Sequence, residues 1–183
     1  MMGEFDAWLE RLASDPLPGA VSAAAVASAM GAGLVAKACR VTLRKEGLAP
    51  AGRQGMQAAF DLAAAQSQVL LELVDADEAA YRAFLAGGLD GPVSPSQVEA
   101  RCQAIEVPIR LAEACLPLLL AVPGLLDLCW LPVCPDLEVG VYFLETGLRT
   151  GLLVAEHNLR AWGDSYFAPL EVRVEALRHL EIP

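Results

Sequence analysis

The feature that most constrains this chain is an uncharged run of small residues at positions 20–36. The run is seventeen residues long, consists mainly of Ala, Ser and Gly, and ends just before Lys37. Small side chains recur in it at intervals of four, which places them on one face of a helix. Such a face lets two helix axes approach more closely than the usual distance of about 8–10 Å. The run therefore predicts a central helix that packs tightly against its neighbours.

A membrane-spanning helix is the alternative interpretation of this run. A span needs about 20 strongly apolar residues, and a run of Ala, Ser and Gly does not supply that hydrophobicity. The second apolar stretch, 114–126, is shorter and contains Pro117 and Pro123. The first residues of the chain are acidic and amphipathic, unlike a signal peptide. We therefore expect a soluble, cytoplasmic protein that does not contact a membrane.

Composition and periodicity indicate a helical fold. The 183 residues are enough for one domain, 1–183, with a sizeable core. Hydrophobic residues make up 55% of the chain, and the excess lies in Ala and Leu, which are strong helix formers. Alternation of apolar and polar residues at the period of a strand is hard to find. We expect an all-α, single-domain bundle of five to six helices with long central helices. The expected helices are 4–13, 20–45, 51–85, 95–121, 135–162 and 169–180.

Local signals mark the ends of these helices. Ser94 followed by Pro95 is typical of an N-cap and a first helical position. Gly87 and Gly88 are expected to end the long third helix, and a loop with Gly91 and Pro92 is expected to follow. Proline removes a backbone donor inside a helix, so the helix over 95–121 is expected to bend or break at its two prolines, Pro108 and Pro117.

Charge and cysteine content exclude some functions. The formal net charge is −10, and such a surface repels phosphate backbones, so nucleic-acid binding is not expected. The five cysteines include no C-x-x-C pair and no spacing typical of a zinc site. We therefore expect buried free thiols in a reducing compartment and no metal. Five of the thirteen basic residues nevertheless gather in a short window: Lys37, Arg40, Arg44, Lys45 and Arg53.

Four segments resemble one known family, that of formiminotetrahydrofolate cyclodeaminase and methenyltetrahydrofolate cyclohydrolase. The family's proline–glycine turn, Ala/Gly-rich helix and basic end resemble PLPGAVSAAAVASAMGAGLVAKACRVTL. Its Asp-x-Asp segment resembles LLELVDADEAAYRAFLAG, and its Val-Pro helix resembles EVPIRLAEACLPLL. The segment with an Asp and a later Asn resembles PDLEVGVYFLETGLRTGLLVAEHNL. The resemblance covers about residues 5–162.

The resemblance implies an all-α homodimer that acts on a tetrahydrofolate derivative carrying a one-carbon unit, without a metal or redox cofactor. The reaction is either closure of the formimino group with loss of ammonia, as in a lyase, or hydrolysis of the methenyl group. The chain departs from the family's motifs by four replacements and by the absence of the Gly-Asn that precedes the Ser-Asp pair in the family. Two glycines after Gly19 are replaced, the Ser before Asp136 is a proline, and one of two asparagines is a valine. The replacing residues are Ala20, Val21, Pro135 and Val154.

The candidate site residues have both functional and structural interpretations. Backbone N–H groups from Gly19 to Ser22 could bind a carboxylate at a helix N-terminus, or Ser22 or Asp15 could simply cap that helix. Asp77 is the candidate proton shuttle, with Asp75 and the aromatic Tyr81 nearby, or these acids are solvated charges.

Two further candidates lie on the helix expected over 135–162. Asp136 is a candidate for stabilising positive charge, or an acid placed favourably for the helix dipole. Asn158 could bind the pterin, or satisfy a neighbouring helix.

The basic end of the helix over 20–45 is a candidate for binding the glutamate tail of folate. Lys37, Arg40 and Arg44 recur at intervals of three and four, so they share one face. Arginine binds carboxylates in a bidentate manner, although cations also favour a helix C-terminus by themselves. The leading hypothesis is thus a folate-dependent one-carbon enzyme of the cyclodeaminase or cyclohydrolase type. The alternative is a folate-binding or protein-interaction module that has lost turnover.

Overall fold

The computed structural model describes residues 2–86, 94–162 and 167–180. These residues form seven α-helices and one short 3-10 helix, and they contain no strand. The all-α prediction is confirmed. The elements in chain order are α1 (Met2–Ser14), α2 (Ala20–Leu43), α3 (Pro50–Ala86), α4 (Pro95–Ala121), α5 (Pro123–Leu126), η1 (Leu131–Val133), α6 (Cys134–Trp162) and α7 (Ala168–Arg178).

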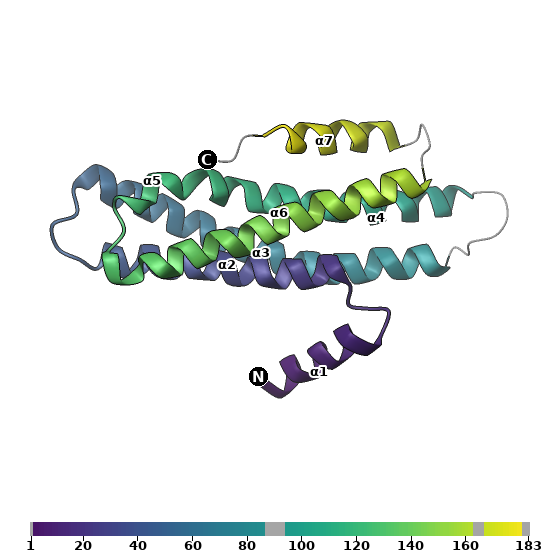
Figure 1. Cartoon of the computed structure of the whole chain (residues 1–183), viewed down its shortest axis with the longest axis horizontal. Coiled ribbons are helices and arrows are strands. Elements are labelled where there is room, and N and C mark those ends of the chain that lie inside the picture. The colour runs from purple at the N-terminus through teal and green to yellow at the C-terminus, as the bar shows by residue number, and fades with distance from the viewer. Residues whose placement is uncertain (1, 87–93, 163–166, 181–183) are drawn as a thin grey trace.

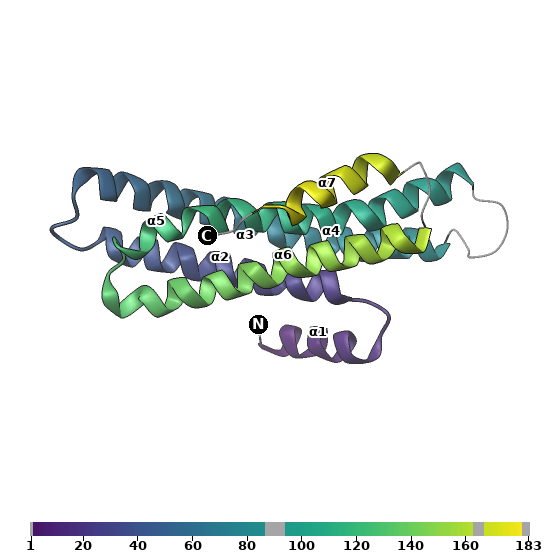
Figure 2. The same ribbon diagram turned by 45° about the horizontal axis from the view of Figure 1, so that its top comes forward.

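The four long helices form an elongated bundle. Helix α2 packs against α3 and α6, while α4 packs against the same two helices (Figures 1 and 2). Helix α7 lies on α4 and α6, where the guanidinium of Arg173 contacts the carboxylates of Glu106 and Glu113 at 2.6 and 2.8 Å. The bundle core is therefore built from α2, α3, α4 and α6, as the expected long helices implied.

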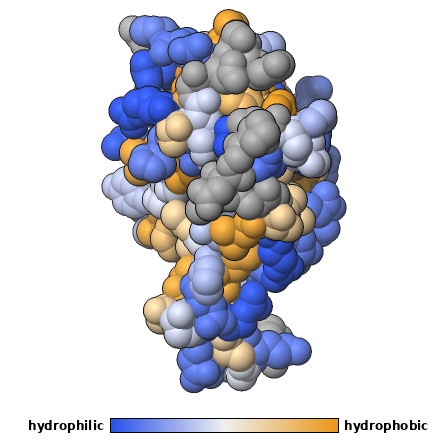
Figure 3. Space-filling view, turned by 90° about the vertical axis from the view of Figure 1, so that its right-hand side faces the viewer, coloured by the Kyte–Doolittle hydropathy of each residue, from blue (hydrophilic) through white to orange (hydrophobic). Residues whose placement is uncertain are grey.

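Helix α1 stands off the bundle beside α2 (Figure 1). An ion pair of 3.2 Å between Arg11 and Glu78 of α3 ties its end to the bundle. Apolar surface is visible between the bundle and α1 when the molecule is viewed from its end (Figure 3). The amphipathic pattern predicted this helix, but it did not predict that the apolar side chains Phe5 and Leu9 would stay 39% and 43% exposed.

Small residues bring α2 and α6 close together. A Cβ added at Gly31 would lie 2.7 Å from the carbonyl oxygen of Gly140, so neither position has room for a side chain. One turn before Gly31, the Ser28 hydroxyl donates to the carbonyl of Phe143 at 3.1 Å. The prediction that the run at 20–36 forms a tightly packed helix is confirmed.

Helix α4 differs from the expectation at its prolines. It runs unbroken from Pro95 to Ala121 with both internal prolines inside it, so of the predicted bend or break, the break is wrong. Pro108 is buried against α6, whose packing holds the helical geometry there. The expected start is confirmed, because the Ser94 side chain accepts from the Gln97 N–H in a capping box. The expected glycine stop at Gly87 and Gly88, and the loop with Gly91 and Pro92, lie outside the described residues.

The connection between α4 and α6 also differs from the expectation. No helix was expected between 121 and 135, but this connection contains the four-residue helix α5 and the helix η1. Prolines stand in the first turn of both, where a missing N–H costs no intrahelical bond. The helix count therefore exceeds the predicted five to six.

Helix α2 is the one described helix whose length and composition would allow it to cross a membrane. Half of its most apolar window of 18 residues is buried inside the bundle. Core helices of soluble proteins pass the same test, so this finding is weak evidence for a span.

The close approach of α2 and α6 predicts an asymmetric response to adding a methyl group. Gly31→Ala should lower the free energy of unfolding by about 1–3 kcal/mol, since its Cβ would meet backbone that cannot give way. Gly55→Ala in α3 should raise it by up to about 1 kcal/mol, because its Cβ meets nothing within 4 Å and Ala favours a helix. Urea denaturation of both variants checks this, and equal responses would contradict the packing described.

Candidate functional site

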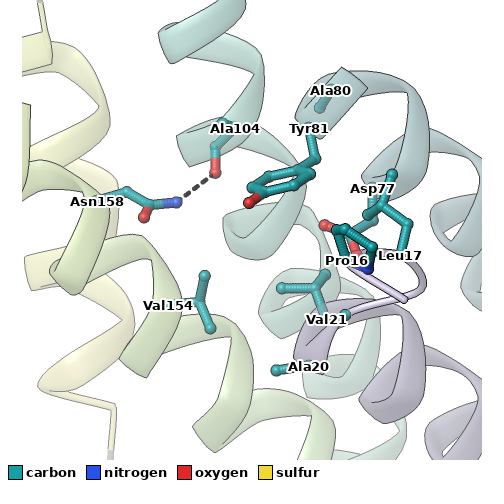
Figure 4. A pocket seen from close by; sticks show the side chains of 11 residues that line it. Pro16, Leu17, Ala20, Val21, Asp77, Ala80, Tyr81, Ala104, Val154 and Asn158 are labelled. Atoms are coloured by element: carbon teal, nitrogen blue, oxygen red, sulfur yellow. Dashed lines mark hydrogen bonds between the residues drawn. The ribbon is translucent and has the colours of Figure 1, made fainter. Parts of the chain in front are cut away.

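A cavity of about 250 Å³ lies where α2 begins, between the segment that precedes it and helices α3, α4 and α6 (Figure 4). Its wall is mostly apolar, with a carboxyl, a phenol and an amide as its polar side chains. It brings together three of the candidate site residues, Gly19, Asp77 and Asn158, with Tyr81, the aromatic residue noted near Asp77. The lining residues are Pro16, Leu17, Gly19, Ala20, Val21, Asp77, Ala80, Tyr81, Ala104, Val154 and Asn158.

Asp77 of α3 binds the N-terminus of α2. Its Oδ2 accepts hydrogen bonds from the Ser22 backbone N–H at 3.1 Å and from the Ser22 hydroxyl at 2.6 Å. Gly19 is the N-cap residue and provides no side-chain bond. The sequence suggested either an anion site or a cap from Ser22 or Asp15 at this helix start. In the structure a carboxylate does lie there, but it belongs to the protein's own Asp77.

The surroundings of Asp77 act on its charge in opposite directions. Burial raises the pKa of its carboxyl above the ordinary value of 3.8, and the neighbouring Glu78 adds to this rise. The two hydrogen bonds from Ser22 work against it, because they stabilise the charged form. Burial has the larger effect. The result is a carboxyl beside a cavity that takes up a proton more readily than an exposed aspartate, as a proton shuttle requires.

Asn158 compensates for a proline in the neighbouring helix. Its Nδ2 donates to the carbonyl of Ala104 at 2.9 Å. Ala104 lies four residues before Pro108, which has no N–H to give to that carbonyl. The Asn158 amide thus takes the place of the missing bond of α4. Its other amide atom, Oδ1, is the one that could accept a hydrogen bond from a ligand.

Tyr81 lies between Asp77 and Asn158. Its hydroxyl points toward Asn158 (Figure 4), and its side chain is 37% exposed. Three of the four replacements in the family's motifs, Ala20, Val21 and Val154, line the same cavity. The replacements are therefore concentrated where a ligand would lie, and they make that wall apolar.

Asp136 and Asp75 lie outside this cavity. Asp136, in the first turn of α6, forms an ion pair of 2.8 Å with Lys37. Lys37 is fifteen residues beyond Ser22 in α2, which places the pair about 22 Å along the helix from Asp77 at 1.5 Å per residue. Asp75 is exposed on α3. The structure therefore does not bring the two candidate catalytic acids, Asp77 and Asp136, together within one chain.

The basic end of α2 is partly engaged in local contacts. Arg53 donates to the carbonyls of Leu43 and Lys45 at 2.7 and 3.3 Å, and so caps the C-terminus of α2. Lys45 lies over the Trp130 ring at 3.5 Å, and Arg40 lies over the Phe60 ring at 5.2 Å. Several of these cations thus have a structural role, but the side chains of Arg40 and Arg44 remain exposed to solvent.

Metal binding finds no support in the described part of the chain. Within it, no group of three or more His, Cys, Asp or Glu side chains could hold a metal ion. All five cysteines are free thiols, and Cys39 and Cys115 are buried.

The comparisons with known proteins identify the family. A family model described as formiminotransferase-cyclodeaminase matches residues 4–175. This chain belongs to that family. The resemblance seen in its motifs is thereby confirmed.

A solved structure agrees with this assignment. The fold is similar to that of formiminotetrahydrofolate cyclodeaminase from Thermotoga maritima, with a TM-score of 0.81 and 16% sequence identity over 90% of this chain and 82% of that one. At this identity the likeness shows the fold alone. No curated protein matches the chain.

Sequence reasoning missed the roles of Pro16, Leu17 and Ala104 in this site. Two of them precede α2 and carry no polar group. Ala104 could have been found from Pro108, because a proline inside a helix frees the carbonyl four residues before it. A polar residue at about the same level of a neighbouring helix is the expected compensation.

This compensation predicts a coupled pair of mutations. Asn158→Ala should lower the free energy of unfolding by about 1–3 kcal/mol, because the Ala104 carbonyl loses its donor. In a Pro108→Ala background the same change should cost less, since the alanine introduced there restores a backbone N–H within reach of that carbonyl. Urea denaturation of the four proteins in this cycle measures the coupling. An equal cost in both backgrounds would show that Asn158 does not replace the missing bond.

Proposed function

We propose that this protein acts on a tetrahydrofolate derivative that carries a one-carbon unit, as a cyclodeaminase or a cyclohydrolase, without a metal or redox cofactor. The observation that carries the proposal is Asp77, a half-buried carboxyl with a raised pKa at the wall of a cavity that also contains Tyr81 and Asn158. Membership of the formiminotransferase-cyclodeaminase family supports the substrate class.

The proposed chemistry needs one group that both accepts and donates a proton. In cyclodeamination, a nitrogen of the folate attacks the formimino carbon, loses its proton, and the amino group of that carbon leaves as ammonia after gaining one. In hydrolysis of the methenyl group, water attacks the cationic carbon and loses a proton. The bond from that carbon to one folate nitrogen then breaks as this nitrogen takes up a proton, and the added oxygen loses its second proton to become the carbonyl of a formyl group. Asp77 can serve either reaction, because a carboxyl with a raised pKa exchanges protons closer to neutral pH.

Asp136 has a role in this proposal only if two chains associate. It was assigned to stabilise positive charge, but it lies about 22 Å along α2 from Asp77 of its own chain. We propose a homodimer in the cytoplasm, in which Asp136 and the basic end of α2 can approach the cavity of the second chain.

The second candidate function is a folate-binding module without turnover. It is favoured by the scarcity of free donors in the cavity. Both donors of Ser22 are taken by Asp77, and the Asn158 Nδ2 already donates one hydrogen bond to the Ala104 carbonyl. Val21 and Val154 add apolar wall rather than groups that orient a substrate.

Turnover distinguishes the two candidates. The wild type should slowly consume 5,10-methenyltetrahydrofolate, followed by the loss of its near-ultraviolet absorbance. Asp77→Asn should reduce the rate by about 10²–10⁴-fold, the usual contribution of an acid–base group, with binding largely kept. The double change Ala20→Gly and Val21→Gly should raise the rate by opening the wall to the ligand. Asp61→Asn, which changes an exposed acid of the same helix far from the cavity, is the matched control.

One outcome would decide against catalysis, and another would decide against the catalytic role of Asp77. If the wild type and Asp77→Asn both proceed at the uncatalysed rate while the folate still binds, the protein is a binding module. If Asp61→Asn lowers the rate as much as Asp77→Asn, the effect belongs to the charge of α3 and not to the cavity.

The basic end of α2 is proposed to bind the glutamate tail. Polyglutamylated tetrahydrofolate should then bind more tightly than the monoglutamate, and the double change Arg40→Gln and Arg44→Gln should remove the difference and its dependence on salt. Arg110→Gln, an exposed arginine of α4, is the control. Isothermal titration of both ligands measures this. Equal affinities for the two ligands in the wild type would leave the arginines with only a structural role.

A further inference from the structure

Two of the five cysteines lie together in the connection between α4 and α6. Cys129 precedes η1 and Cys134 is the first residue of α6, so η1 separates two thiols that are five residues apart. The two side chains interact directly with each other. The Cys134 thiol also donates to the carbonyls of Cys129 and Trp130, at 3.7 Å each. Both thiols are half-buried, so a small molecule from solvent can reach them.

This thiol pair is held against the end of α2 by hydrogen bonds. The Thr42 hydroxyl is buried in the last turn of α2, where it donates to the Cys129 sulfur at 3.9 Å and accepts from the Trp130 N–H at 3.1 Å. The end of α2 and the start of α6 lie at the same end of the bundle (Figures 1 and 2). These contacts hold the segment between the cysteines against α2, so the two thiols stay beside each other in the folded chain.

The surroundings of Cys129 make it a poor first nucleophile. Burial raises the pKa of its thiol from 9.0 to about 11, and the contact with Cys134 adds to this rise, while the Thr42 hydrogen bond opposes it. A thiol attacks a disulfide as its thiolate, so this pKa slows the reaction of Cys129 with a small disulfide. Cys134 is therefore the better candidate for the first attack. Cys129 lies beside it, where it can displace a group added to the Cys134 sulfur.

The other three cysteines have different surroundings. Cys39 lies near the thiol pair, but it and Cys115 are buried, at 1% and 0% exposed, so a reagent in solvent does not reach them. Cys102 is half-buried like the pair. Burial and the charges of Glu99 and Glu106 raise the pKa of its thiol, which disfavours the thiolate. The thiol pair thus combines access from solvent with a second thiol in contact.

We propose that Cys129 and Cys134 are a redox-modification site, which a small-molecule disulfide such as oxidised glutathione converts to an intramolecular disulfide. The Cys134 thiolate attacks one sulfur of oxidised glutathione, which releases one glutathione thiolate and leaves a mixed disulfide. The Cys129 thiolate then attacks the Cys134 sulfur and releases the second glutathione. The protein loses two protons and two electrons, and oxidised glutathione gains them as it becomes two molecules of glutathione.

The proposed site is remote from the candidate cavity. Thr42 is twenty residues beyond Ser22 in α2, or about 30 Å along the helix at 1.5 Å per residue. Oxidation of the pair therefore does not depend on the proposed turnover or on a folate ligand. The ring that the disulfide closes contains Trp130, whose side chain lies under Lys45 of the basic end of α2. In a reducing compartment such disulfides are transient and respond to the redox state.

The mass of one peptide detects the disulfide directly. The purified protein is incubated with oxidised glutathione, unfolded, alkylated at its remaining thiols and cleaved before its aspartates. Peptide 127–135 contains Cys129 and Cys134 and no other cysteine. It should escape alkylation and weigh less by two hydrogen atoms, and dithiothreitol should restore both thiols.

Single substitutions separate the two steps. Cys129→Ser should retain glutathione on Cys134 as a stable mixed disulfide, because the thiol that displaces it is absent. Cys134→Ser should add glutathione to Cys129 about tenfold more slowly than this, since a pKa of about 11 lowers the thiolate fraction and a higher nucleophilicity offsets only part of that loss. Cys102→Ser is the matched control, and it should form the disulfide at the wild-type rate.

A comparison of folded and unfolded protein tests whether the fold places the thiols for reaction. The measured quantity is the value of [GSH]²/[GSSG] at which half of the pair is oxidised, in buffer and in urea. In the folded protein this value should be about tenfold higher or more, because the fold raises the effective concentration of one thiol at the other.

Four results would overturn the proposal or its steps. A fully alkylated peptide 127–135 in the wild type means that the disulfide does not form. A cross-link to peptide 15–60, which contains Cys39, shows a different pairing. An equal or lower [GSH]²/[GSSG] value in the folded protein shows that the fold does not favour the disulfide. Faster addition of glutathione to Cys134→Ser than to Cys129→Ser reverses the assigned order of attack.

Discussion

The close approach of α2 and α6 is the constraint on which the rest of the structure depends. It requires glycine where the two helices touch, at Gly31 and Gly140, and it draws α2 into the bundle along its length. The first turn of α2 is thereby held against α3, so Ser22 can donate both its hydrogen bonds to Asp77. The same packing brings α6 to the other side of the cavity, where Val154 and Asn158 lie one turn apart. A wider separation of α2 and α6 would open the cavity to solvent and remove the burial that acts on Asp77.

The Asp77 side chain has both a structural role and a proposed chemical role. As an ion it stabilises the N-terminus of α2, where exposed N–H groups favour a negative charge. As a neutral acid it avoids the cost of burying that charge, and this second effect is the larger one for its pKa. Protonation therefore weakens its bond to Ser22, and a ligand that exchanges a proton with Asp77 also acts on the start of α2. The apolar replacements at Val21 and Val154 line the same cavity, and they reduce the number of groups that can orient a substrate.

The fold could be predicted from the sequence more fully than the site. Strong helix formers, caps and the spacing of small residues act locally, so the long helices and the capping box at Ser94 were predicted within a few residues. The expected break in α4 was wrong because packing against α6 holds Pro108 in a helix and because Asn158 replaces its lost donor. Helix α5 was missed because four residues are too few to show a periodic pattern.

The sequence by itself determined which residues share a helix and which face of that helix they occupy, because both depend only on spacing along the chain. The sequence was enough to identify Asp77, Asn158, Asp136 and the basic end of α2 as candidate site residues. It was also enough to show the resemblance to one family. Only the tertiary structure decided which of these groups meet. Asp77 faces the same cavity as Asn158, whereas Asp136 pairs with Lys37 about 22 Å away along α2. The physical reason is that the relative position of two helices along their axes comes from packing between residues far apart in sequence, which the pattern within either helix does not contain.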